Sequence, residues 1–253
     1  MFFGNMLHFS KCPSTNVKAG RSYMDENGYE WNSKQKQLAA SLRGRNTFHE
    51  GIRLCLEMHA QVHDLKREPQ RKTIYQHLID GLDEGLVRFR PERQFSSIAW
   101  NLWHISRIED AVTNMLIAAT DQVFNKKWQN TIGVGMTDTG NAMQWNDVER
   151  FDAMINVQAL YQYRKAVGER TQEILPQIRA EERLKKPDTE RLSRLLDEGV
   201  LINDPESLWL LDYWKNKTIV GLLLMPITRH QIVHIHDSFK IKRKYGKNFG
   251  HEA

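Results

Sequence analysis

Apolar residues recur at every third or fourth position through much of the chain, which is the spacing that places them on one face of an α-helix. This pattern begins near Ser33 and is broken at Gly44. The sequence that follows, residues 47–50 (Thr-Phe-His-Glu), has the form of a capping box with Thr as N-cap and Glu at the third helical position. It predicts a first long helix that continues to about Leu65.

The next part of the chain predicts a short helix, a connector and a second long helix. A weaker helical pattern covers residues 74–82, and Pro91 prevents the segment around it from continuing as a helix. Ser96 is a good N-cap residue, and the apolar pattern after it predicts a helix to about Thr120. Three glycines then predict a loop between residues 125 and 145.

The third long helix is predicted to run from Val157 to about Leu175, where Pro176 ends or kinks it. Asp188 is the expected N-cap of a short helix that reaches Glu198. The pair Asp204-Pro205 combines an N-cap aspartate with proline at the first helical position, so another helix is predicted to begin there.

The fourth long helix is predicted over residues 217–244 with a kink at Pro226, because proline removes one backbone donor. Four long amphipathic helices without a convincing alternating strand predict an all-α protein built on a four-helix bundle with extra short helices. We expect an irregular N-terminal arm over residues 1–32, a single helical-bundle domain over 33–246 and a C-terminal tail over 247–253.

Composition places the chain among ordinary globular proteins, with 40% hydrophobic and 26% charged residues. The longest apolar run, residues 219–227, is far shorter than the roughly 20 residues that cross a bilayer, so no membrane span is predicted. The first seven residues lack the basic start of a signal peptide, and Met24 is an alternative start. A cytoplasmic location is therefore expected.

The net charge of +5 is concentrated partly near the C-terminus, at Lys240, Lys242, Arg243, Lys244 and Lys247. Without a recognisable reading motif this group is interpreted as a solvated helix end, and no nucleic-acid partner is predicted. The two cysteines, Cys12 and Cys55, do not predict a disulfide framework. Cys55 lies in an apolar helical stretch and is interpreted as a core residue, with a thiolate nucleophile as the alternative.

Histidines supply the candidate chemistry. His230 and His234 are four residues apart, so they lie on one face of the last helix, and Asp237 returns to that face. His104 lies on the apolar face of the second long helix, where an imidazole needs hydrogen bonds or a metal ion. By spacing alone, His59 and His63 on the first helix are an equally good pair.

Two segments carry a family resemblance. SSIAWNLWHISRIED (residues 96–110) resembles the second-helix motif of the DinB/YfiT-like superfamily, and LLLMPITRHQIVHIHD (residues 222–237) resembles its last-helix motif. Weaker similarity extends the resemblance over roughly residues 46–244. It implies a helical bundle and a three-histidine metal site, which corresponds to His104, His230 and His234 in this sequence.

The resemblance also implies roles for nearby side chains. Related sequences often have Glu at the position of Asp237, which is therefore a candidate to orient an imidazole or act as a general base, with a helix-surface acid as the alternative. Arg107 is a candidate to bind an anionic substrate group, or else to pair with a nearby acid such as Glu109 or Asp110. His59 and His63 are expected to line the pocket, to add a fourth ligand or to fill polar niches.

Characterised members of the superfamily include thiol-dependent transferases and isomerases. The resemblance therefore implies a nickel, zinc or iron ion at which a low-molecular-weight thiol is transferred to an electrophilic small molecule. Hydrolysis by metal-bound water is the close variant. The alternative from a different class is a non-catalytic metal- or ligand-binding bundle, and a homodimer is left open.

Overall fold

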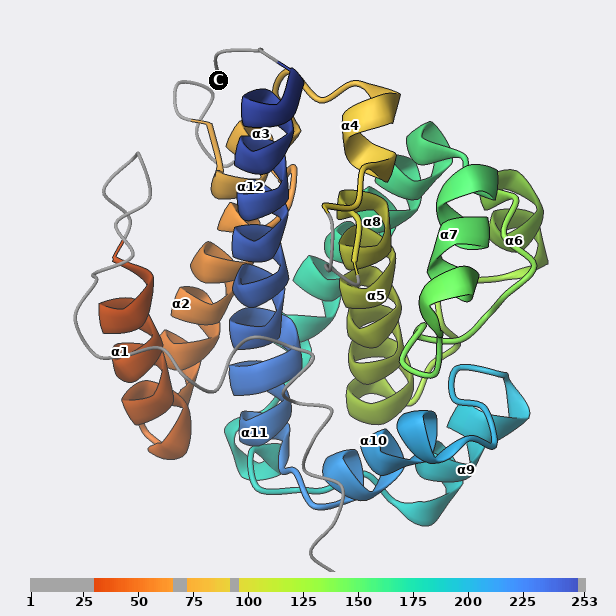
Figure 1. The fold of residues 1–253 in the computed structure, drawn as a ribbon. Helices are drawn as coiled ribbons and strands as arrows, with labels where there is room; N and C mark the ends of the chain where they lie inside the picture. The colour runs from red at the N-terminus through yellow and green to blue at the C-terminus, as the bar shows by residue number, and fades with distance from the viewer. Residues whose placement is uncertain (1–29, 66–71, 92–95, 250–253) are drawn as a thin grey trace, which may run out of the picture.

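The described part of the protein is built of helices. The computed structural model describes residues 30–65, 72–91 and 96–249, and within these ranges no β-strand occurs. Figure 1 shows α12 (His230–Phe249), from the C-terminal part of the chain, lying beside α5 (Ile98–Asp110). The predicted all-α class is confirmed.

The helix at the centre of the molecule is α5. All thirteen of its residues are buried, and it contacts α8 (Val157–Ile174) and α12 (His230–Phe249). The chain continues from α5 without a break into a π-helical segment, Ala111–Ala118. Because α5 has no solvent-exposed face, every polar side chain on it requires a partner inside the protein.

The remaining helices surround α5 or extend the structure at its ends. They are α1 (Trp31–Arg43), α2 (Phe48–Gln61), α3 (Ile74–Ile79), α4 (Glu84–Arg88), α6 (Lys126–Ile132), α7 (Trp145–Met154), α9 (Thr189–Asp197), α10 (Pro205–Lys215) and α11 (Ile219–Leu224). The four predicted long helices correspond to α2, α5 with its π-helical extension, α8, and α11 joined to α12.

Several start and stop signals act as the sequence predicts. Asp188 caps α9 by accepting the Arg191 N–H, and Asp204 caps α10 by accepting the Glu206 N–H. The third long helix ends at Ile174, where Pro176 allows only a short 3-10 turn. These helix starts and this helix end are set by the local sequence. A carboxylate accepts a hydrogen bond from a free N–H at a helix start, and proline has no N–H with which to continue a helix.

Other local predictions were wrong. The Thr47 hydroxyl does not cap α2 but donates to the Ser41 carbonyl at 2.8 Å, which closes the α1–α2 turn. Ser97, not Ser96, caps α5. The predicted connector and loop each contain a short helix, α4 and α6, which are capped by Asp83 and Asn125.

Pro226 interrupts the last long helix more sharply than a simple kink. The segment Met225–Arg229 forms a π-helical turn between α11 and α12. The Leu224 carbonyl, which lies at this interruption, accepts the Thr228 hydroxyl at 3.0 Å and the Gln35 side-chain amide at 2.9 Å. Side chains thus add hydrogen bonds to the backbone at the point where the helix is interrupted.

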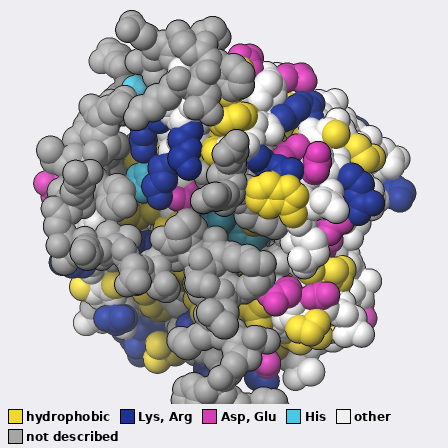
Figure 2. Space-filling model, viewed as in Figure 1, with side chains coloured by type: hydrophobic (Ala, Val, Ile, Leu, Met, Phe, Trp, Pro, Cys, Tyr) yellow, Lys and Arg dark blue, Asp and Glu magenta, His cyan; other side chains and the backbone are white. Residues whose placement is uncertain are grey.

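Some predictions lie outside the described residues. Most of the predicted N-terminal arm, including Met24, belongs to residues 1–29, and the tail from residue 250 onward is likewise not described. Helix α1 begins at Trp31, within the range assigned to the arm. Among the described helices, none has the length and apolar character that a bilayer crossing needs. Figure 2 shows basic, acidic and apolar side chains interspersed on one face.

Candidate metal centre

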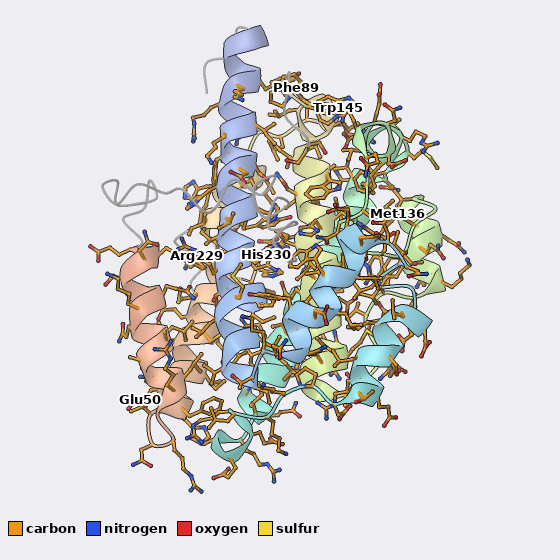
Figure 3. The ribbon with its side chains drawn as sticks, turned by 60° about the horizontal axis from the view of Figure 1, so that its bottom comes forward. Glu50, Phe89, Met136, Trp145, Arg229 and His230 are labelled. Atoms are coloured by element: carbon orange, nitrogen blue, oxygen red, sulfur yellow. The ribbon has the colours of Figure 1, made fainter. Side chains whose placement is uncertain are left out.

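Three histidines from two distant parts of the chain meet inside the bundle. His104 comes from the middle of α5, whereas His230 and His234 occupy the first two turns of α12. One ring nitrogen from each lies within 4.8 Å of the others, and the Nε2 atoms of His104 and His230 are 3.2 Å apart. Figure 3 shows His230 at the start of α12, with Arg229 directed toward α1.

The hydrogen bond of His104 fixes its tautomer. Its Nδ1 lies 2.7 Å from the Thr139 carbonyl oxygen, which can only accept. Nδ1 therefore carries the hydrogen, and Nε2 keeps its lone pair. The Trp100 ring stacks on the imidazole with centroids 4.8 Å apart and planes within 7°. His104 is thus held in one orientation with a basic nitrogen directed at His230.

A chain of three hydrogen bonds fixes His234 in the same way. The Ser238 hydroxyl donates to the His234 carbonyl oxygen at 2.8 Å, so its oxygen accepts from the Asn101 amide nitrogen at 3.1 Å. The Asn101 carbonyl oxygen then faces His234 Nδ1 at 3.0 Å and accepts its hydrogen. His234 consequently also keeps its lone pair on Nε2.

His230 differs from the other two because it is only half-buried and its Nδ1 has no hydrogen-bond partner among the described residues. Burial lowers the pKa of His104 to about 4. Burial, together with the neighbouring imidazoles, holds the pKa of His230 and of His234 well below the ordinary value. All three rings are therefore neutral near pH 7, the state in which histidine binds metal ions.

This donor set fits a divalent metal ion. Metal-bound histidines usually donate their second ring N–H to a carbonyl or carboxylate, as His104 and His234 do here. A tetrahedral ion with bonds of about 2.0–2.1 Å separates its ligand nitrogens by roughly 3.3 Å, close to the 3.2 Å between His104 and His230. Three histidines leave a position for a further ligand.

The comparison with known families agrees with the helical architecture. A model described as DinB superfamily matches residues 70–200, about half of the chain. The chain belongs to the DinB superfamily. A search of curated proteins gave no match.

The DinB match includes α5 and therefore His104, but it ends before α11 and α12. His230 and His234 lie outside the matched residues, and only the structure places them next to His104. The resemblance seen in the SSIAWNLWHISRIED segment lies within the matched range. The resemblance of the last helix lies outside it.

A second buried cluster in this DinB chain contains the other histidine pair. His59 Nε2 lies 2.7 Å from Glu109 Oε1, and His63 Nε2 lies 2.8 Å from Glu109 Oε2. The Thr171 hydroxyl also donates to Glu109, at 2.7 Å. All four side chains are fully buried. Gly168 permits this packing, because a Cβ there would lie 2.5 Å from His63 Nδ1.

The outer contacts of this second cluster indicate a hydrogen-bonded network. The Gln172 amide nitrogen donates both to the Leu56 carbonyl oxygen at 3.1 Å and to His59 Nδ1 at 2.8 Å. His59 Nδ1 therefore accepts, and its hydrogen is on Nε2, directed at Glu109. A metal ligand would need the opposite tautomer, since the nitrogen that binds the ion cannot carry a hydrogen.

The charge on Glu109 also agrees with a hydrogen-bonded network in the second cluster. Burial alone raises the pKa of Glu109, but the contacts with His63 and His59 outweigh it and hold this pKa well below the ordinary value. Burial lowers the pKa of His63 to about 3. An ionised carboxylate thus accepts hydrogen bonds from the His59 and His63 rings and from the Thr171 hydroxyl. These contacts favour the third alternative, in which His59 and His63 fill polar niches, and the two rings do not belong to the first cluster.

Arg107 is fully buried, and its hydrogen-bond partners among the described residues do not include the three histidines. Its guanidinium donates to Asp110 at 3.2 Å, to the Tyr163 hydroxyl at 2.9 Å and to the Thr137 carbonyl at 2.9 Å. Asp110 is itself fully buried and also accepts the Tyr163 hydroxyl at 2.6 Å. These contacts favour the ion-pair alternative, although the acid is buried and not on the surface.

Asp237 and Cys55 also differ from a catalytic arrangement. The Asp237 carboxylate accepts from Lys240 at 2.7 Å, and no hydrogen bond joins it to an imidazole of the described residues. Asp237 is only 6% exposed, so it is a largely buried acid and not the helix-surface acid of the alternative. Burial, and then the nearby Glu109 carboxylate, raises the pKa of the Cys55 thiol to about 12. A thiol that is neutral at pH 7 is a poor nucleophile.

Several residues that shape the candidate centre or the second cluster carry little or no signal in the sequence. The Thr139 carbonyl and the Asn101 side chain orient two histidines, and Glu109 organises the second cluster. A weak signal exists for Asn101 and Glu109. Both lie on a helix whose apolar residues cover every face, so each polar side chain on it must have a buried partner.

The metal-free protein is expected to lose stability as the pH falls from 6.5 toward about 4. His104 has a pKa of about 4 in the folded protein and 6.5 ordinarily, so the unfolded chain binds more protons in this interval. Above pH 6.5 the His104 ring is neutral in the folded and the unfolded chain, so it does not lower the free energy of unfolding. Below about pH 4 the ring is protonated in both states, and about 3 kcal/mol of the free energy of unfolding has been lost.

Urea unfolding at pH 7.0, 5.5 and 4.5 with a chelator measures this loss. A His104→Gln variant should show a shallower pH dependence than the wild-type protein. Equal dependence in the two proteins would contradict the assignment to His104.

Proposed function

We propose that His104, His230 and His234 hold one divalent metal ion, and that this DinB protein uses the centre to transfer a low-molecular-weight thiol to an electrophile. The supporting observation is the pair of fixed tautomers. His104 and His234 are each anchored through Nδ1–H, so both present Nε2 lone pairs at a buried point where the described residues supply no carboxylate. Such a point attracts a cation.

A divalent ion held by His104, His230 and His234 would supply a Lewis acid able to lower the pKa of a bound thiol or water molecule. The protein's own residues do the rest. Burial keeps the three imidazoles neutral, and stacking on Trp100 keeps the His104 ring in place. His230 is the most exposed of the three, so the centre is approached most directly from its side.

In the proposed transfer, the thiol sulfur forms a bond with an electrophilic carbon, and the leaving group departs with its electron pair. The thiol proton passes to solvent. Hydrolysis is the variant in which water takes the place of the thiol. Neither reaction needs an oxidant or a reductant.

A second candidate function is a metal-binding bundle without catalysis. It is favoured by the position of the three histidines, which join α5 to α12 in the interior. An ion there would stabilise the fold even if no substrate reached it.

Stripping and reloading the metal separates these functions. Untagged protein is treated with chelator and reloaded with nickel, zinc or iron. It is then assayed with glutathione or N-acetylcysteine and 1-chloro-2,4-dinitrobenzene, and separately with p-nitrophenyl acetate. We expect turnover by the reloaded protein to exceed that of the stripped protein at least about tenfold, as for a bound Lewis acid.

The melting temperature is measured on the same samples. Metal-dependent stability without turnover of any thiol or ester would contradict the enzyme and support the non-catalytic bundle. Metal that neither binds nor stabilises would contradict both.

A further inference from the structure

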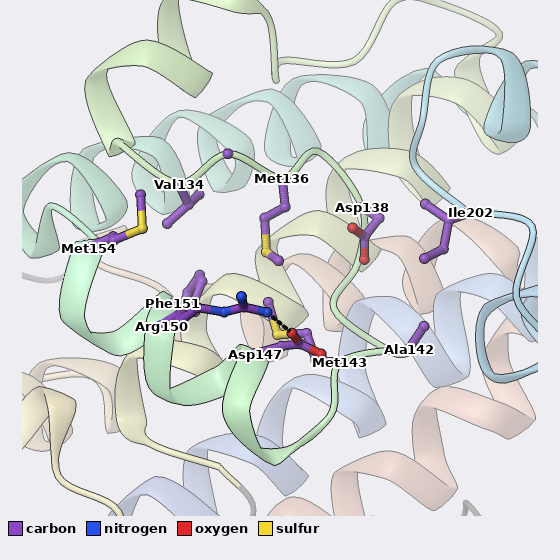
Figure 4. A pocket seen from close by; sticks show the side chains of 11 residues that line it. Val134, Met136, Asp138, Ala142, Met143, Asp147, Arg150, Phe151, Met154 and Ile202 are labelled. Atoms are coloured by element: carbon purple, nitrogen blue, oxygen red, sulfur yellow. Dashed lines mark hydrogen bonds and ion pairs between the residues drawn. The ribbon is translucent and has the colours of Figure 1, made fainter.

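A separate pocket lies beside the loop that orients His104. It has a volume of about 380 Å³, which is within the range of small-molecule sites. The loop at residues 134–143 and helix α7 form its walls, and Ile202 completes the rim. Figure 4 shows the side chains of Met136 and Asp138 directed into the same space.

The walls of this pocket are largely apolar and adaptable. Three methionines line it, Met136, Met143 and Met154, together with Phe151. Met154 and Ile202 are 60% and 40% exposed, which is unusual for large apolar side chains. Methionine side chains adjust to irregular shapes and make favourable contacts with aromatic rings. An occupant with an aromatic or aliphatic body would bury this exposed apolar surface.

One carboxylate faces the pocket without a cation of its own. Asp138 is only 9% exposed, and its Oδ1 accepts the Gly140 N–H at 2.7 Å. No ion pair to this carboxylate occurs among residues 30–65, 72–91 and 96–249, and the Arg107 guanidinium, which acts on it from a greater distance, is paired with Asp110. The nearby cation of the lining, Arg150, is bound to Asp147 at 2.5 Å. Burial raises the pKa of Asp138, a cost that a bound cation would offset.

We propose that this pocket binds a small organic cation, with its ammonium group on the Asp138 carboxylate and its apolar body among Met136, Met143 and Met154. Charge complementarity selects this class of ligand, since the pocket offers a nearly buried carboxylate that forms no ion pair with a described residue. An alcohol of the same shape would find the apolar walls but not the ion pair. An acid would meet repulsion from Asp138.

The pocket is distinct from the three-histidine centre. His104 directs Nδ1 toward the pocket loop, at Thr139, and Nε2 toward His230 on the opposite side of the ring. Asp138 and Thr139 are adjacent, and the Asp138 carbonyl oxygen accepts the Trp103 indole N–H at 3.2 Å. Binding of a cation does not depend on metal at the histidines, so this proposal and the proposed function can fail separately.

Isothermal titration calorimetry with three matched probes tests the proposal. The probes are 4-phenylbutylamine, 4-phenylbutanol and 4-phenylbutanoate, each titrated into the protein as isolated. We expect one saturable site for the amine, at least about tenfold tighter than for the alcohol, and no binding of the acid. Equal affinity for amine and alcohol, or no amine binding, would overturn the proposal.

Variants locate the binding. Asp138→Asn should weaken the amine at least about tenfold and change the alcohol by less than about threefold, as expected for loss of one desolvated ion pair. Asp121→Asn removes the same charge from a side chain that is 98% exposed and should change neither probe. Ala142→Trp, on the pocket lining, should block both probes.

Folding of each variant is checked by circular dichroism and melting temperature. Should Asp138→Asn fail to fold, the amine–alcohol difference in the wild-type protein and its loss in Ala142→Trp still decide the matter. Undiminished amine binding by a folded Asp138→Asn or Ala142→Trp protein would place the cation elsewhere and overturn the proposal.

Discussion

Replacing His230 with alanine is expected to remove the bound divalent metal ion almost completely. The variant loses one of three nitrogens that meet at a single buried point. Loss of even an outer hydrogen-bonding partner costs about 10–100-fold in metal affinity, so loss of a ligand should cost at least as much. Elemental analysis of untagged protein by mass spectrometry measures the change.

His236→Ala is the matched control for this experiment. His236 lies on α12 only two residues after His234, but it does not belong to the three-histidine cluster. Its replacement should leave the metal content as in the wild-type protein. Equal metal in the His230→Ala and wild-type proteins would rule out the proposed centre.

Replacing Glu109 with alanine is expected to destabilise the fold by about 3–5 kcal/mol, the usual cost of breaking a buried charged network. The substitution leaves the His59 and His63 N–H groups and the Thr171 hydroxyl without their acceptor. Metal content should not change, because this cluster is interpreted as hydrogen-bonded. Urea unfolding and elemental analysis on the same preparation measure both quantities.

Glu57→Ala is the control for Glu109, since Glu57 pairs with Lys34 at the surface and is 46% exposed. Its loss should cost less than about 1 kcal/mol. A Glu109→Ala protein that loses an equivalent of metal would show that the second cluster is itself a metal site.

Much of the helical architecture could be predicted from local sequence. Apolar periodicity and cap residues located the four long helices, and Asp188 and Asp204 marked helix starts because a carboxylate satisfies free N–H groups wherever such an end occurs. Thr47 shows the limit of this reasoning. Its hydroxyl contacts a residue on the preceding helix, so its role depends on how two helices meet.

The candidate site was predictable to a lesser extent. Spacing alone did not distinguish the pair His230 and His234 from the pair His59 and His63. The difference lies in the group behind one ring of each pair, an asparagine oxygen at His234 and a glutamine amide donor at His59. These groups come from segments distant in sequence, and no periodic pattern encodes them.

The π-helical turn at Met225–Arg229 sets the orientation of everything that follows it. A π-turn holds about one residue more than an α-turn, and each helical residue advances the chain by about 100°. Deleting one residue here to restore a continuous α-helix would rotate His230 and His234 away from α5 or displace α11 from α1. The irregular turn therefore changes the rotation of α12 relative to α11, so that α11 packs on α1 while α12 packs on α5.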